Sequence, residues 1–124
     1  MLRSIAAVVA GYVVFAVSAV ALFAGAGRDA HAAAPMWFMV FSTVCGMAFA
    51  TLAGYLAARI AGRRELLHAG MVSAIIAVGA VSSIFTRPIG GTLWGQIAAL
   101  ALMAPAATLG GVLRRQPGTT PGAR

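Results

Sequence analysis

The chain has 124 residues and a net charge of +7, yet only 9% of its residues are charged and 61% are hydrophobic. A soluble domain carries charges on about a quarter of its residues, so this composition excludes an ordinary soluble protein. The mean hydropathy of +0.95 and four long apolar runs instead predict an all-α integral membrane protein.

The positive charge has a topological explanation. All nine basic residues are arginines that lie at the ends of apolar runs or in the C-terminal tail. They form no basic stripe interleaved with aromatic residues, so we expect no nucleic-acid partner. Cys45 is the single cysteine, which excludes an intramolecular disulfide and a cysteine-based metal site.

The first apolar run covers about residues 4–26 and contains no Asp, Glu, Lys, Arg or His. Arg3 precedes it and the small-residue stretch 30–32 follows it, a pattern that also resembles a signal peptide. Because the apolar stretch is longer than a usual signal core, we interpret it as a retained membrane helix.

The second run covers about residues 35–58 and has small residues at a four-residue spacing, which indicates a helix face for close packing. This face comprises Gly46, Ala50, Gly54 and Ala58. Glycine costs a helix about 1 kcal/mol relative to alanine, so Gly54 implies a close neighbour. The loop to the third run is short, so we expect that run to be the neighbour.

The third and fourth runs cover about residues 66–85 and 92–113. They carry further small-residue rows, for which we predict the same packing role: Gly70, Ala74, Gly91, Gly95 and Ala99. Pro105 is expected to kink the fourth run. Together the runs predict a single four-helix transmembrane domain over residues 1–115, followed by a flexible polar tail over 116–124.

Four spans place both termini on one side of the membrane. That side carries seven arginines and the opposite side carries two, Arg28 and Arg87, so the positive-inside rule predicts an antiparallel four-helix bundle with cytoplasmic termini. The topology depends chiefly on Arg59, Arg63, Arg64, Arg114 and Arg115. Aromatic residues near the predicted span ends are expected to anchor the two interfaces, and these are Trp37, Tyr55 and Trp94.

Few polar side chains lie within the runs. Gln96, Ser82 and Ser83 could line a small polar pocket, or could make interhelical hydrogen bonds. The two histidines, His31 and His68, fall at opposite ends of the predicted spans, about 30 Å apart, which argues against a shared haem or metal. We therefore predict no cofactor and no metal.

The apolar runs contain no Asp, Glu or Arg, and no nucleophile lies beside a base. Ion-coupled transporters and proton relays place ionisable groups within their spans, and enzymes need a nucleophile or an acid–base pair. The sequence therefore predicts neither an enzyme nor an ion-coupled pump.

Two segments carry a resemblance to a known group of proteins, Ala6-Ala-Val-Val-Ala-Gly-Tyr12 and Gly54-Tyr-Leu-Ala-Ala-Arg-Ile-Ala-Gly-Arg-Arg64. In these the chain resembles the small, uncharacterised four-span membrane proteins of GC-rich bacteria. The resemblance implies a location in the bacterial cytoplasmic (inner) membrane. It implies no activity.

Two functions are open at this point. The first is a structural or accessory subunit that packs against other membrane proteins, or against itself, through its small-residue faces. The second is a homo-oligomeric pore or carrier for a small neutral or hydrophobic solute, with Gln96 and the expected kink at Pro105 near its path. The lipid bilayer is the expected partner in both cases.

Overall fold

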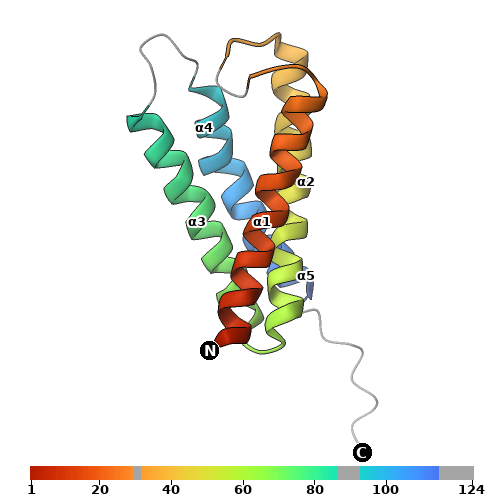
Figure 1. The fold of residues 1–124 in the computed structure, drawn as a ribbon, viewed down its shortest axis with the longest axis vertical. Coiled ribbons are helices and arrows are strands. Elements are labelled where there is room, and N and C mark those ends of the chain that lie inside the picture. Colours follow the sequence, from red (N-terminus) through yellow and green to blue (C-terminus); the bar gives the residue numbers. More distant parts are fainter. Residues whose placement is uncertain (30–31, 87–92, 115–124) are drawn as a thin grey trace, which may run out of the picture.

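The computed structural model describes residues 1–29, 32–86 and 93–114. Within these ranges the chain is all-α and forms four helices long and apolar enough to cross a membrane, as predicted (Figure 1). The first three are α1 (Leu2–Gly25), α2 (Met36–Ala61) and α3 (Glu65–Phe85). The fourth has three consecutive parts: α4 (Trp94–Ala98), the π-helical segment η1 (Ala99–Met103) and α5 (Ala104–Arg114).

The connection between α2 and α3 is shorter than expected, because α2 continues three residues past the predicted boundary to Ala61. Gly62 ends the helix with φ 68°, a left-handed conformation that glycine adopts without a Cβ penalty, and its N–H bonds to the carbonyl of Ala58 at 3.1 Å. Arg64 is also left-handed, with φ 50°. Glu65 then begins α3, where its carboxylate suits the positive end of the helix dipole.

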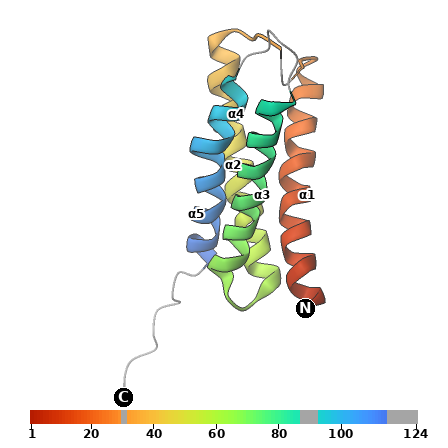
Figure 2. The same ribbon diagram turned by 90° about the vertical axis from the view of Figure 1, so that its left-hand side faces the viewer.

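The start of α1 and the end of α5 lie at the same end of the molecule (Figures 1 and 2). Arg3 Nε donates to the carbonyl of Ile60 at 2.7 Å, and Arg114 lies 3.9 Å from the carboxylate of Glu65. These contacts join α1 to α2 and α5 to α3 at one end of the molecule, which also carries Arg59, Arg63 and Arg64. We call it the arginine end.

Helix α2 is the most connected element, since it packs against α1, α3 and α5. Helix α3 also contacts α1 and α5, whereas α1 makes no close backbone approach to α4, η1 or α5. The core is built largely from alanines, whose small side chains let the helix axes come close: Ala50, Ala53, Ala57, Ala104, Ala106 and Ala107, together with Val8, Val72 and Ile76.

The closest backbone approach joins α2 to α5. A Cβ placed on Gly54 would collide with the carbonyl of Ala107, and one placed on Gly110 would collide with the carbonyl of Thr51. The expectation that the third run covers the face around Gly54 was therefore wrong, because the nearest backbone belongs to α5. A short loop makes two helices neighbours, but it does not decide which neighbour meets the glycine.

The small residues of α3 behave differently. A Cβ on Gly70 would meet nothing within 4 Å, and Ala74 is exposed. Neither residue packs tightly against another of the described helices. Any close packing at these positions would therefore involve a second chain, and it stays a prediction. Gly91 lies outside the described residues.

The turn before Pro105 is the irregular part of the fourth membrane-length helix. Proline lacks the N–H that would continue the hydrogen-bond ladder, and its ring crowds the preceding turn. The structure accommodates it with the π-helical segment Ala99–Met103, directly before α5. Wider turns of this kind are a recognised cause of helix bending.

We predict that Gly54→Ala destabilises the protein by about 1–3 kcal/mol, because the added methyl group has no space beside the Ala107 carbonyl. Gly79→Ala is the matched control, since it makes the same change within a helix where nothing lies within 4 Å. Thermal unfolding in detergent measures both. Equal melting temperatures for the two variants would contradict the α2–α5 contact.

Candidate functional site

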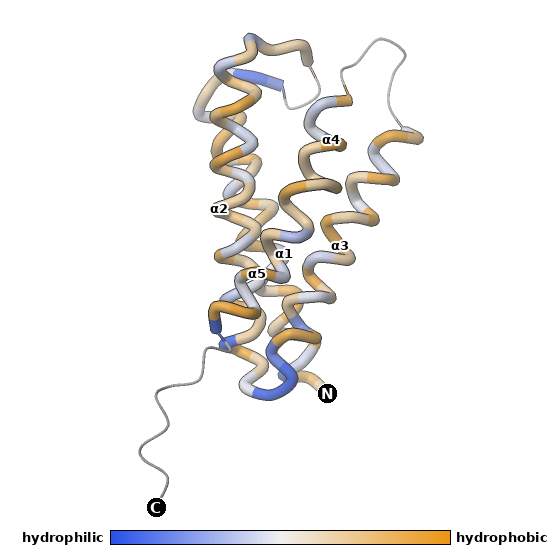
Figure 3. Tube along the Cα trace, turned by 180° about the vertical axis from the view of Figure 1, so that it is seen from behind, coloured by the Kyte–Doolittle hydropathy of each residue, from blue (hydrophilic) through white to orange (hydrophobic). Residues whose placement is uncertain are grey.

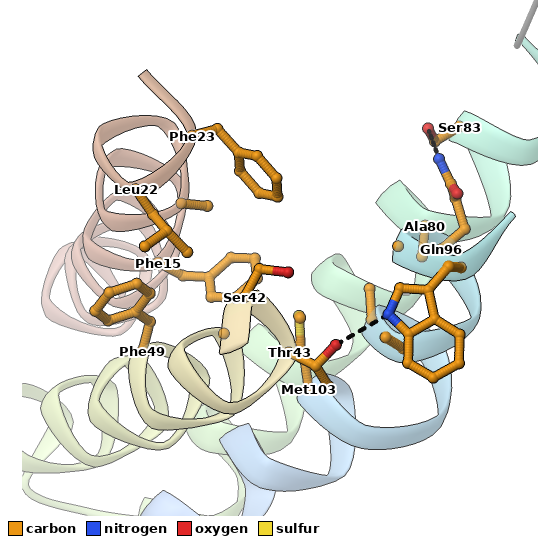
Figure 4. Close-up of a pocket in the computed structure, with 16 residues that line it drawn as sticks. Phe15, Leu22, Phe23, Ser42, Thr43, Phe49, Ala80, Ser83, Gln96 and Met103 are labelled. Carbon is orange, nitrogen blue, oxygen red and sulfur yellow. Dashed lines mark hydrogen bonds between the residues drawn. The ribbon is translucent and has the colours of Figure 1, made fainter. Parts of the chain in front are cut away.

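A cavity of about 270 Å³ lies in the half of the molecule away from the arginine end (Figure 4). Its walls come from the C-terminal halves of α1 and α3, the N-terminal half of α2, and α4 with η1. Helix α3 diverges from α1 and α2 toward this end (Figure 1). Because α1 does not approach α4 or η1, side chains rather than backbone contacts bound the space between them.

One side of the cavity is apolar and aromatic. Helix α1 contributes Phe15, Ala19, Leu22 and Phe23, whose spacing places them on a single helix face. Phe49 adds a further ring from α2. Such a wall binds by dispersion and by excluding water, and it offers no hydrogen bond.

The other side carries polar atoms from three helices. Gln96 is 5% exposed, and its Nε2 donates to Ser83 Oγ at 3.2 Å. The indole Nε1 of Trp94 donates to Thr43 Oγ1 at 3.2 Å, as Figure 4 shows. These bonds connect α4 to α3 and to α2, so they hold the polar wall in place.

Two hydroxyls of α2 share one backbone acceptor. Ser42 Oγ donates to the carbonyl of Met39 at 3.1 Å, and Thr43 Oγ1 donates to the same carbonyl at 2.7 Å. Each hydroxyl has a single proton, so both oxygens present lone pairs in their remaining directions. Trp94 uses one from Thr43, while Ser42 lines the cavity and points toward the space between the walls (Figure 4).

The deep end of the cavity is closed by Met103. A Cβ on Gly46 would collide with the thioether of Met103, so the glycine provides the space that this side chain occupies. Methionine is flexible and polarizable, which suits a position between a cavity and a tightly packed alanine core. Below it lie Ala50, Ala53 and Ala104 of the core.

Aromatic rings and one arginine cover the opposite end. Phe23 and Phe38 make an edge-to-face contact at 5.8 Å, and the Arg28 guanidinium lies 4.9 Å from the Phe38 ring centre. Arg28 also lies 5.9 Å from the ring of Trp37. A smaller space of about 30 Å³, bounded in part by Asp29, adjoins the cavity and shares Ser42 with it.

None of the described residues that line the cavity is ionisable. Across residues 1–29, 32–86 and 93–114, no three His, Cys, Asp or Glu residues gather where they could hold a metal ion. His68 is buried in the first turn of α3, with Nδ1 3.0 Å from the carbonyl of Arg64, far along the chain from the cavity lining. The site is therefore suited to binding by shape and hydrogen bonding.

The structure separates the residues that the sequence grouped as a polar pocket. It brings Gln96 and Ser83 together in the cavity wall and leaves Ser82 exposed outside it. Gly95 and Ala99 line the cavity, and Ala99 also packs against the core, as expected of a helix contact. Trp94 forms part of the wall and is also 39% exposed, and Trp37 is 64% exposed, so their role at the membrane interface stays a prediction. Arg115 lies outside the described residues.

Sequence reasoning missed the aromatic wall. The spacing of Phe15, Ala19, Leu22 and Phe23 was a usable signal, because it describes one helix face. However, the intervening positions of this run are also apolar, so no contrast in polarity distinguished an inward face from a lipid-facing one.

The chain matches no protein-family model, no curated protein and no solved structure.

We predict that Gly46→Ala costs less stability than Gly54→Ala, below about 1 kcal/mol, although both glycines are buried in α2. At Gly46 the obstacle is the flexible end of Met103, which can rotate into the cavity, whereas at Gly54 it is backbone. Thermal unfolding of the two variants under identical conditions tests this. A Gly46→Ala loss as large as that of Gly54→Ala would show that Met103 cannot move.

Proposed function

We propose that the protein is an integral membrane carrier that binds a small, neutral, mainly apolar solute. The observation that carries the proposal is the cavity of about 270 Å³, with its aromatic wall and no charged side chain among the described residues that line it. Pockets with apolar walls and a few placed polar groups are typical small-molecule sites. The described residues that line the cavity include no nucleophile–base pair, and we propose no catalytic step.

The proposed setting is an antiparallel four-helix bundle in the cytoplasmic membrane of a bacterium, with both termini in the cytoplasm. Large apolar side chains are exposed on every membrane-length helix, as expected for contact with lipid. Hydrophilic residues gather at the arginine end (Figure 3), which the positive-inside rule assigns to the cytoplasm. The cavity then lies in the outer half of the bilayer.

The neutral and apolar character of the solute follows from its surroundings. Burying an unpaired charge in an apolar site costs far more than dispersion contacts return, so a charged solute would need a counter-charge that the described residues of the lining do not offer. An apolar cavity of about 150 Å³ holds benzene, so a cavity of about 270 Å³ suits about eleven non-hydrogen atoms.

The close packing of the helices near the arginine end favours a carrier over an open pore. Between the cavity and the arginine end, the backbones of α2 and α5 meet at Gly54 and Gly110, and no channel separates them there. On the opposite half, α1 leaves α4 and η1 uncontacted, which favours access for an apolar solute from the surrounding lipid.

A structural or accessory role is the second candidate. It is supported by the part of α3 around Gly70 and Ala74, which is small, lipid-facing and uncovered within the chain. A second copy or another membrane subunit could pack there through close helix approach. The face around Gly54 no longer supports this candidate, because α5 already covers it.

The topology can be tested with two single cysteines in a Cys45→Ala background. Arg63→Cys lies in the α2–α3 loop and Ala33→Cys lies before α2, and both positions are exposed. We expect a membrane-impermeant maleimide to label Ala33→Cys in intact cells and Arg63→Cys only after lysis. Labelling of both positions from the same side would contradict the proposed arrangement.

The cavity can be tested by filling it. We expect Ala80→Leu to weaken the binding of radiolabelled naphthalene to protein in nanodiscs by about tenfold or more, because the added atoms occupy the site. Ala74→Leu makes the same change on the same helix outside the cavity and should bind as the wild type does. Empty nanodiscs correct for partition into lipid. Equal binding by both variants would rule out this cavity as the site.

A further inference from the structure

We propose that the solute is a hydrogen-bond donor, an alcohol or phenol whose hydroxyl donates to Ser42 Oγ while its apolar body fills the cavity toward Met103. This inference rests on the proposed function, and it specifies the chemical class of the solute. It depends on which protons of the cavity wall already donate hydrogen bonds to acceptors of the protein itself.

The hydroxyl and indole protons next to Ser42 are directed at protein acceptors. Ser42 and Thr43 both donate to the Met39 carbonyl, and Trp94 donates to Thr43. What Ser42 presents to the cavity is consequently an oxygen acceptor. An ether or ketone brings only acceptors and gains nothing there, whereas a hydroxyl brings the proton that this oxygen can accept.

The position of Ser42 also orients the solute. Ser42 lines both the cavity and the smaller space next to it, so it lies where the two meet. Met103 lies at the other, deeper end of the cavity. An amphipathic molecule bound this way keeps its hydroxyl toward the membrane surface and its rings toward the bilayer centre, as it would in the lipid itself.

Asp29 is not part of the proposed binding site. It borders only the smaller space, whose volume of about 30 Å³ is room for about one water molecule. A cationic solute would have to place its charge there while its body stayed in the cavity. A solute hydroxyl that bonds to Ser42 requires no such arrangement, because both the hydroxyl and Ser42 are neutral.

Three probes of matched shape test the inference: 2-naphthol, which donates; 2-methoxynaphthalene, which only accepts; and naphthalene, which does neither. Binding to the full chain in nanodiscs is measured for each and expressed as a mole fraction in the lipid, with empty nanodiscs subtracted. We expect 2-naphthol to bind about three- to tenfold more tightly than the other two, the effect of one net hydrogen bond.

Three variants locate the effect. Ser42→Ala should remove the preference for 2-naphthol and leave naphthalene binding unchanged, and Ser42→Thr should retain the preference because it keeps the oxygen. Ser73→Ala removes a hydroxyl of α3 that does not line the cavity and should change nothing. If Ser42→Ala fails to fold, Ser42→Cys replaces it, since sulfur is a poor acceptor in the same place.

The outcomes separate the two proposals. Equal binding of all three probes, blocked by Ala80→Leu, would overturn the donor requirement and leave the carrier proposal standing. A 2-naphthol preference that persists in Ser42→Ala would overturn the assignment to Ser42. Binding that does not exceed empty nanodiscs, or that Ala80→Leu does not affect, would overturn the proposed function itself.

Discussion

The contact between the backbones of α2 and α5 is the constraint on which the rest of the structure depends. At Gly54 and Gly110 each helix presents a bare backbone to a carbonyl of the other, so neither position has room for a Cβ atom. In a membrane, where lipid is as apolar as the side chains, such close packing is a main source of association between helices. The alanine core around this contact extends it to α1 and α3.

The same constraint explains the position of the cavity. Near the arginine end, glycine and alanine let the helices close completely, whereas the other half carries Phe15, Phe23, Phe49 and Trp94, whose rings need more room. The π-helical turn before Pro105 lies at the transition between the two halves. A cavity in one half is the consequence of small residues in the other.

The directions of the hydrogen bonds in the cavity wall decide which solutes it can bind. Two hydroxyls and an indole direct their protons at protein acceptors, and the described part of the lining carries no charge. In water such a wall would matter little, because the solvent competes for every group. In an apolar environment, a wall proton that already bonds to the protein is not available to a solute. A few such side chains are therefore enough to give the proposed carrier its selectivity.

The sequence by itself determined the four membrane-length helices and the placement of arginines at their ends, because both depend only on composition along the chain. It also marked Gly54 as a site of close contact, since glycine is costly in a helix without one. Only the tertiary structure decided that the contact is with Ala107 of α5, that Trp94 and Ser42 face a cavity, and that Gly70 does not pack within the chain. The physical reason is that nearly every position in these runs is apolar. Without alternating polarity, only the three-dimensional match of small and large side chains determines which face turns inward.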